Sequence, residues 1–258
     1  MPELPDLTVF AENLTKRLKG KTVKSVELYP TRNCRGTIEE LEEALRGNSV
    51  EEVNRVGKET EFVFSKGTKI HVHLMLSGRF EIVKNAQSIK SKILVIEFED
   101  GDILVVHDYQ GMATVKLNPE ENFVPDALDV TEDYVKERMF KKFKNDVKTF
   151  LTDPKVIRGI GNAYADEILW HARISPKSLV GKIPEEVIDV LVNSIKVVLL
   201  DAVTEIKKAD PEIIAGEIRD FLKVHNHSKK LSPTGHKIIK ELINKRPTYY
   251  TEEQILYV

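Results

Sequence analysis

The stretch DPKVIRGIGNAYADEILWHARISP, residues 153–176, decides the fold of this chain. Gly159 and Gly161 stand just before Asn162, and apolar residues with the spacing of a helix follow them. The glycines predict a tight turn that opens a helix. Backbone N–H groups at such a helix start, together with the Asn162 amide, form a site for phosphate. An ordinary glycine-rich helical turn is the alternative interpretation.

The sequence around this stretch has the period of helices up to about residue 220. The helices expected there are 131–143, 147–153, 162–172, 184–208 and 211–225. Trp170 is expected in the core of this helical part rather than as a platform for a base. Two strands, 237–243 and 247–258, are expected at the end of the chain, with a turn at NKRP.

The first half of the chain has a different pattern. A helix is expected from Asp6, a possible N-cap, because Leu7, Phe10, Leu14 and Leu18 follow it at helical spacing. A short helix is expected at 37–47, among runs that alternate apolar and polar residues as strands do. The expected strands are 22–29, 61–66, 69–76, 79–84, 92–100 and 102–109.

Together these patterns predict an α+β protein: a helix plus an antiparallel β-sandwich, then a helical domain, then a terminal β-hairpin. The expected domains are 1–124, 125–228 and 229–258, with a linker near 119–125. A length of 258 residues with 41% hydrophobic residues allows a core in each large domain.

Composition excludes several classes of protein. The single Cys34 can form neither an internal disulfide nor a cysteine-based zinc site. No apolar stretch reaches the roughly 20 residues of a membrane helix, and the N-terminus lacks the pattern of a signal peptide. We therefore expect an intracellular, soluble monomer, cytoplasmic and at the nucleoid if the source is prokaryotic, with no membrane partner.

The formal net charge of −2 seems to argue against a nucleic-acid partner, but the charge is unevenly distributed. Residues 133–158 carry a charge of +4 and residues 223–246 carry +6. Lys148 and Lys155 in the first of these segments are candidates for phosphate contacts. A solvated basic face is the alternative interpretation of such runs.

The first residues could carry covalent chemistry. Removal of Met1 would leave Pro2 with a secondary amine, which is nucleophilic at neutral pH because the pKa of an α-amine is near 8. Glu3 beside it could act as a general acid or base in opening a sugar ring. Alternatively, MPE is merely a common start of a coding sequence. Asp6 could orient the amine, cap the first helix, or do both.

The motifs MPELPD, RVGKETEF, HLMLSGRF and residues 153–176 occur in an order that resembles the formamidopyrimidine-DNA glycosylase and endonuclease VIII family of base-excision repair. The resemblance implies a helix–two-turn–helix motif at 153–176. It also implies Pro2 as nucleophile, Lys58 as a second catalytic residue, and Leu76 as the residue that fills the base stack. His73 would contact phosphate as its family counterpart does, or be a structural histidine.

The tail resembles the family's zinc finger without its cysteines. Aligning KRPTYYT with the family's hairpin places Arg246 at the arginine that grips phosphates. The four cysteine positions are then taken by Ser232, Gly235, Thr251 and Gln254. We expect a zincless finger, without a metal, in which apolar packing of the two strands replaces zinc; a decayed domain is the alternative.

Two departures from the family pattern bear on specificity. DYQGMATV, with Gln110 and Met112, replaces the family's Arg-Arg-Phe-Gly run, so an apolar wedge remains while the arginine contact to the orphaned base is lost. The stretch between Lys207 and Arg219 is too short for the loop that caps 8-oxoguanine. The first departure puts recognition of the opposite base in doubt, and the short stretch favours oxidised pyrimidines, hydantoins or abasic sites.

The resemblance implies a DNA glycosylase and AP lyase without a cofactor, acting on damaged or abasic double-stranded DNA that lies across a cleft between two domains. The damaged nucleotide would be flipped out, a Schiff base would form at Pro2, and β,δ-elimination would cut the strand. Phosphates would be held by Lys58, Asn162 and Arg246. A non-catalytic protein that binds damaged DNA is the alternative, and an unrelated RNA-binding protein is a third.

Overall fold

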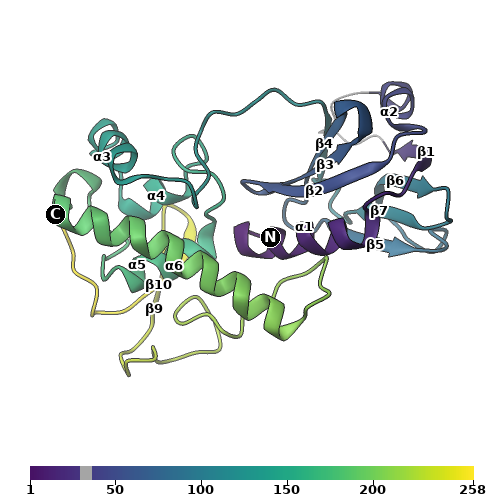
Figure 1. The fold of residues 1–258 in the computed structure, drawn as a ribbon. Helices are drawn as coiled ribbons and strands as arrows, with labels where there is room; N and C mark the ends of the chain where they lie inside the picture. Colours follow the sequence, from purple (N-terminus) through teal and green to yellow (C-terminus); the bar gives the residue numbers. More distant parts are fainter. Residues whose placement is uncertain (30–36) are drawn as a thin grey trace. The chain divides into compact units, whose positions relative to one another are not determined.

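The computed structural model describes residues 1–29 and 37–258, so Cys34 lies outside the described residues. The chain forms two compact units (Figure 1). The first unit comprises Met1–Asn122 and Ile206–Glu217, and the second comprises Phe123–Glu205 and Ile218–Val258. The expected three-part division of the chain stays a prediction.

The first unit is a helix packed on two four-stranded antiparallel sheets. Its helices are α1 (Leu4–Leu18) and α2 (Ile38–Leu45). One sheet has the order β1-β6-β7-β5, with bounds Val23–Leu28, Lys92–Phe98, Ile103–His107 and Arg79–Val83. The other has the order β2-β3-β4-β8, with bounds Val50–Val56, Glu59–Phe64, Lys69–His73 and Thr114–Leu117. The expected helix-plus-sandwich architecture is confirmed.

The apolar stripe of α1 explains its position. Leu7, Phe10, Leu14 and Leu18 are all buried in one cluster with the inward faces of both sheets. Each such side chain contributes about 1.5–3 kcal/mol by leaving water. Asp6 is not the N-cap, as had been expected. The helix begins at Leu4 because Pro5 suits the first turn, which makes Glu3 the N-cap residue.

All six expected strands are present as β1 and β3–β7, but β2 and β8 are additional. β2 escaped prediction because Val50 and Val53 are its only fully buried residues and they are three positions apart, which breaks the alternation of a strand. β8 is only four residues long, and one of these residues is buried. Both strands are at the edges of the same sheet, where β2 pairs with β3 and β8 pairs with β4.

The second unit is mainly helical. Its helices are α3 (Glu132–Lys141), α4 (Val147–Thr152), α5 (Asn162–His171) and most of α6 (Glu185–Ala209), of which residues from Ile206 belong to the first unit. All four helices lie where the periodicity predicted them. Short 3₁₀ turns occur at Ser65–Gly67 in the first unit and Val180–Lys182 in the second. Trp170 is half-buried on α5 rather than fully in the core.

The helix expected at 211–225 is absent, and this prediction was wrong. The segment is irregular, and its apolar residues serve two cores: Ile213 and Ile214 pack in the first unit, whereas Leu222 and Val224 are buried in the second. The buried Glu167 carboxylate accepts the backbone N–H groups of residues 223, 224 and 225 at 2.7–2.8 Å. These donors are therefore satisfied without a helix.

The terminal hairpin is formed by β9 (Ile239–Ile243) and β10 (Arg246–Tyr250). The second strand is shorter than the expected 247–258. After Tyr250 the chain turns back onto α5, and Ile255 exchanges backbone hydrogen bonds with Arg173 and Ser175 at 2.8 Å. The last residues are therefore held by the helical part instead of extending the hairpin.

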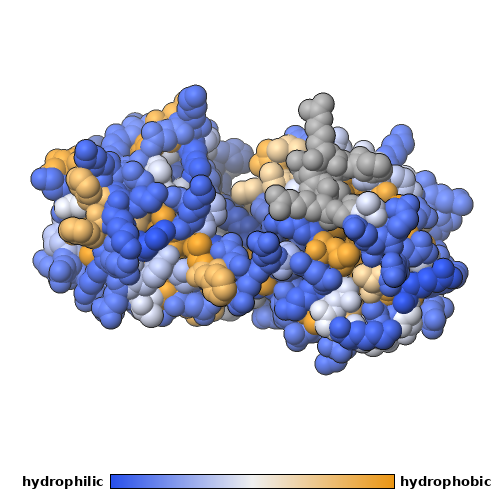
Figure 2. Space-filling view, turned by 90° about the horizontal axis from the view of Figure 1, so that it is seen from above, coloured by the Kyte–Doolittle hydropathy of each residue, from blue (hydrophilic) through white to orange (hydrophobic). Residues whose placement is uncertain are grey.

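The visible surface of both units is largely hydrophilic (Figure 2). None of the helices in the described parts of the chain combines the length and apolarity needed to cross a bilayer.

Candidate active site and nucleic-acid interface

A cavity of about 290 Å³ in the first unit lies beside the N-terminus. It is lined by Pro2, Leu76, Ser77, Gly78, Arg79, Tyr109, Gly216 and Glu217. Pro2 itself is buried. The α-ammonium group of Met1 forms an ion pair with Glu217, a residue from the far end of the chain. The structure thus brings the expected nucleophile and the expected stack-filling Leu76 to one cavity.

Glu3 and Asp6 together hold the start of α1. The Glu3 N–H donates to Oδ2 of Asp6 at 2.8 Å, and the Glu3 side chain accepts the Asp6 N–H, which forms a reciprocal capping box. Glu3 is only 4% exposed. Asp6 therefore orients the N-terminal segment through the Glu3 backbone. This arrangement fixes the direction of the chain between Pro2 and the start of α1.

The buried Asp108 joins the two loops that were expected to enter the base stack. Its carboxylate accepts the Ser77 hydroxyl and the backbone N–H groups of Gln110, Met112 and Ala113, the last three at 2.7–3.0 Å. Although burial opposes ionisation, these donors lower the pKa of Asp108. Leu76, next to Ser77, is 56% exposed. The Leu76 loop and the Gln110–Met112 loop therefore form one preorganised surface.

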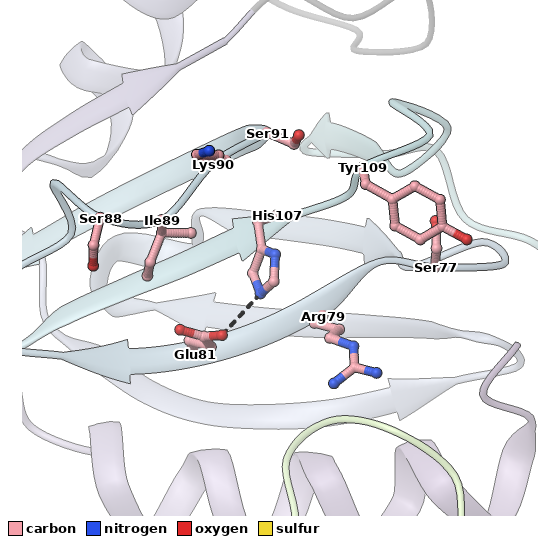
Figure 3. A pocket seen from close by; sticks show the side chains of 9 residues that line it. All are labelled: Ser77, Arg79, Glu81, Ser88, Ile89, Lys90, Ser91, His107 and Tyr109. Carbon is pink, nitrogen blue, oxygen red and sulfur yellow. Dashed lines mark ion pairs between the residues drawn. The ribbon is translucent and has the colours of Figure 1, made fainter.

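Tyr109 is a further exposed residue on this surface, and sequence reasoning missed it. Its side chain is 76% exposed and lines both the Pro2 cavity and a second hollow of about 460 Å³ (Figure 3). Arg79 and Ser77 also line both hollows. In the second hollow His107 Nε2 lies 3.1 Å from Glu81 Oε1, outside hydrogen-bond geometry. An exposed aromatic ring beside an arginine is suited to stacking on a base.

Lys58 lies at the tip of the β2–β3 hairpin. Val56 pairs with Glu59, so Gly57 and Lys58 form a two-residue turn, and Gly57 has the positive φ (64°) that such turns require.

Next to this turn, the His71 ring lies 2.9 Å from Glu59 and 2.8 Å from Glu61. Burial disfavours a charged ring, but these carboxylates raise the pKa of His71. Glu59 also pairs with Lys116 at 2.6 Å, and its pKa is lowered to about 2 despite burial.

His73, at the end of β4, has a defined tautomer. Its Nδ1 accepts the Met75 N–H at 2.9 Å, so the ring proton is on Nε2. Burial lowers the pKa of His73; the charge of Glu59 opposes this shift, while the charges of Lys58 and Lys116 add to it. The ring is therefore neutral at physiological pH, with its second nitrogen as a donor.

In the second unit Asn162 and Arg246 lie together. Gly159 has a φ of 105°, which only glycine adopts readily, and the chain then enters α5 at Asn162. The Asn162 amide donates to the carbonyl oxygen of Pro247 at 2.8 Å, and Arg246 donates to the Thr152 hydroxyl. The positive end of the α5 dipole and an arginine are thus neighbours, an arrangement suited to phosphate. Lys155 is exposed nearby in sequence.

Lys148 does not fit the expected role in phosphate binding. It is 2% exposed, and its ammonium group is 2.7 Å from Asp166 Oδ1 and 2.7 Å from the Thr248 hydroxyl. Asp166 also binds His225 at 2.6 Å and accepts the Tyr249 N–H at 2.9 Å. Lys148 therefore joins α4, α5 and β10 inside the unit and does not reach solvent.

Comparison with known proteins decides the family. A model of the formamidopyrimidine-DNA glycosylase N-terminal domain matches residues 1–115, and a model of the formamidopyrimidine-DNA glycosylase H2TH domain matches residues 123–211. The chain belongs to the formamidopyrimidine-DNA glycosylase family. The expected enzyme class, a DNA glycosylase of base-excision repair, is thereby confirmed, and the family combines glycosylase with AP-lyase activity.

Individual relatives agree over nearly the whole chain. The formamidopyrimidine-DNA glycosylase of Carboxydothermus hydrogenoformans is 30% identical, covering 97% of this chain and 98% of that protein. The enzyme of Mycoplasma genitalium is 28% identical, covering 97% and 94%. Lactococcus lactis Fpg, solved with abasic-site DNA and with oxidised-pyrimidine DNA, has the same fold, with a TM-score of 0.86, 24% identity and coverage of 97% and 98%.

Ser232 and Thr251, two of the four positions expected to align with the family's cysteines, belong to a polar cluster around the Glu253 carboxylate. That carboxylate accepts the Thr234, Thr251 and Ser232 hydroxyls at 2.7, 3.1 and 3.3 Å, and pairs with Arg173 at 2.9 Å. The Thr234 hydrogen bond contributes most to a pKa of Glu253 that is lowered to about 2. Gln254 donates to the Ile174 carbonyl oxygen at 2.8 Å. None of these side chains offers a thiolate, so the group does not fit zinc.

The expected apolar packing of the finger is wrong at three of eight positions. Leu242 is 71% exposed, and Ile255 and Leu256 are also exposed, because the hairpin has a single sheet face against the unit. Tyr249 is buried against His225. The other four expected apolar residues are half-buried: Ile238, Ile239, Ile243 and Tyr250. The finger is therefore held by polar groups rather than by an apolar core of its own.

Proposed function

We propose that this glycosylase acts on oxidised pyrimidines, hydantoins and abasic sites in double-stranded DNA, through a Schiff base at Pro2 and β,δ-elimination. The observation that carries the proposal is the cavity that contains Pro2 and is bordered by Leu76, Arg79 and Tyr109. A flipped nucleotide placed in it would have its C1′ near the proline nitrogen. The proposal requires removal of Met1.

The reaction uses residues of the first unit. The Pro2 nitrogen attacks C1′, the glycosidic bond breaks, and its electron pair leaves with the base. Glu3 gives a proton to the sugar ring oxygen as the ring opens. The resulting iminium acidifies C2′–H, so loss of this proton expels the 3′ phosphate, and a second elimination expels the 5′ phosphate. Lys58 and His73, at the ends of neighbouring strands, bind the phosphates beside the target.

The surface formed by the Leu76 and Gln110–Met112 loops would enter the duplex. Leu76 would fill the space left by the flipped nucleotide and Met112 would act as a wedge. Tyr109 would stack on a neighbouring base, replacing contacts that arginines make elsewhere in the family. In the second unit, Asn162, Arg246 and Lys155 would hold the DNA backbone.

The preference for small lesions rests on the segment after α6. Arg17 donates to the Glu212 carbonyl oxygen at 2.7 Å, and Asn13 donates to that of Ile213 at 2.9 Å. These contacts hold the segment against α1, which leaves few residues that could cap a purine. Lactococcus lactis Fpg has been crystallised with an oxidised pyrimidine, which is compatible with such substrates in this family.

We further propose that the finger is zincless and that the Glu253 cluster does the work of the metal. The proposal is supported by the groups present in this cluster, which are hydroxyls, an arginine and one carboxylate joined by hydrogen bonds and an ion pair. They occupy the region where a zinc finger would have its thiolates. In this finger, β10 carries Arg246 to the start of α5.

A lesion panel tests the proposed function. Duplexes carrying an oxidised pyrimidine, a hydantoin, 8-oxoguanine or an abasic site are incubated with protein whose N-terminus is verified as Pro2. We expect cleavage of all but the 8-oxoguanine duplex, with phosphates on both sides of the gap. Tight binding without cleavage would favour the non-catalytic alternative, and preferred cleavage at 8-oxoguanine would refute the substrate assignment.

A further inference from the structure

The ion pair between the α-ammonium of Met1 and the Glu217 carboxylate places an acidic group at the amine end of the chain. Both side chains are about one-third exposed, and Pro2 and Glu217 line the same cavity. Adjacent backbone nitrogens in a chain are about 3–4 Å apart. The Pro2 nitrogen is therefore within reach of Glu217 once Met1 has been removed.

Residues of the first unit hold Glu217 close to the N-terminus. Ile213 and Ile214 pack on the sandwich core, and the Ile213 carbonyl oxygen accepts the Asn13 amide at 2.9 Å. Gly216 then takes a φ of 89°, which turns the chain toward the N-terminus. The segment that replaces the expected helix thus delivers a carboxylate to the N-terminal amine.

The catalytic amine needs a proton acceptor. An α-amine with a pKa near 8 is mostly protonated at neutral pH, and only its neutral form can attack a carbon atom. The Glu3 carboxylate accepts the Asp6 N–H as part of the helix cap, and in the proposed reaction it acts on the sugar ring oxygen. Glu217 is the carboxylate that the structure pairs with the N-terminal amine.

We propose that, in the chain without Met1, Glu217 is the catalytic base for Pro2. The inference rests on the proposed function. The Pro2 ammonium gives one proton to the Glu217 carboxylate, and the freed lone pair forms the N–C1′ bond with the aldehyde carbon of an opened abasic sugar. The carbonyl oxygen becomes a hydroxyl as it takes the second proton from the Pro2 nitrogen. The Glu217 carboxylic acid then returns its proton to this hydroxyl, which leaves as water when the iminium forms.

The competing explanation is a surface ion pair without function. Such a pair contributes only about 0–1 kcal/mol and would vanish with Met1. It predicts no effect of Glu217 on the chemistry of mature protein. A catalytic base predicts a change in the pH dependence of the reaction, because a carboxylate beside an ammonium group raises the pKa of the amine.

The test compares wild type with Glu217→Gln, Glu217→Asp and the control Glu212→Gln, all as full chains with Pro2 verified as the N-terminus by mass spectrometry. Glu212 is a matched control because it lies on the same segment and pairs with Arg17 rather than with the N-terminus. Trapping by cyanoborohydride on an abasic duplex is measured from about pH 5 to pH 9. Binding to a duplex with a stable abasic analogue is measured in parallel.

We expect Glu217→Gln to bind the analogue normally, to be trapped at least about tenfold more slowly, and to have its pH midpoint about one unit lower. Glu212→Gln should match wild type, and Glu217→Asp should recover part of the rate. An unchanged rate and midpoint in Glu217→Gln would overturn the inference, as would a slower rate with an unchanged midpoint. Failure of wild type itself to be trapped would refute the proposed function as well.

Discussion

Replacing Lys148 with Met tests whether this lysine is structural or binds DNA. The side chain is 2% exposed, and its ammonium group is 2.7 Å from Asp166 Oδ1 in the interior of the second unit. Removing one member of a buried ion pair costs about 3–5 kcal/mol, because the remaining charge is left without its partner. The His225 ring, 2.6 Å from the same carboxylate, compensates in part, so we expect the lower end of this range.

The assay is urea unfolding of the full chain, followed by the fluorescence of Trp170. This is the chain's single tryptophan, and it lies on the same helix as Asp166. With a typical urea dependence of about 1–3 kcal/mol per molar, the unfolding midpoint of Lys148→Met should fall by at least about 1 M. Lys148→Met combined with Asp166→Leu should recover part of the loss, since no charge is then stranded.

The matched control is Lys155→Met, whose side chain is exposed. It should leave the unfolding midpoint unchanged and lower the salt dependence of DNA binding by about 0.9 in log–log slope, the value for one phosphate contact. A stable Lys148→Met protein with a lowered salt slope would refute our assignment of Lys148 and restore its expected role at the DNA backbone.

Three further perturbations have defined outcomes. The pKa of Glu253 is lowered from 4.5 to about 2, chiefly by the Thr234 hydroxyl, so its contribution to stability is present above about pH 4.5 and is lost as pH falls toward 2. Thermal unfolding of Glu253→Gln should lack this acid-dependent loss, and an identical pH profile would argue against the polar cluster. Asp108→Ala should remove three backbone hydrogen bonds from the Tyr109–Ala113 loop. Binding to abasic duplex, measured by fluorescence anisotropy, should then weaken at least about tenfold. An unchanged affinity would show that the loop does not need these hydrogen bonds. Gly159→Ala, at a φ of 105°, should lower the free energy of unfolding by about 1–3 kcal/mol, and a neutral effect would contradict the turn geometry.

The regular parts of the fold were predictable because their signals are local. The stripe of Leu7, Phe10, Leu14 and Leu18 needs only a sheet to cover it, and the structure supplies two. The same holds for α3 to α6 and for six of the eight strands of the first unit. The irregular segment 211–225 could not be predicted, because Glu167, on a helix distant in sequence, accepts three of its backbone N–H groups.

The candidate site was predictable where a motif marks it and hidden where only the tertiary structure assembles it. The motifs marked Pro2, Leu76 and Asn162. No local pattern distinguishes Glu217, which becomes notable only because the chain folds back to the N-terminus. Lys148 was misjudged for a similar reason, since a lysine in a basic run gives no sign of a buried aspartate on the next helix.

The role of Pro2 as the nucleophile is tested by locating the covalent adduct. Protein with Pro2 as its verified N-terminus is trapped with borohydride on an abasic duplex, digested with protease and nuclease, and mapped by mass spectrometry. We expect the sugar remnant to be attached to the Pro2 nitrogen, and protein that retains Met1 to form no adduct. An adduct on Lys58 or another lysine, or efficient trapping by the protein that retains Met1, would contradict this role.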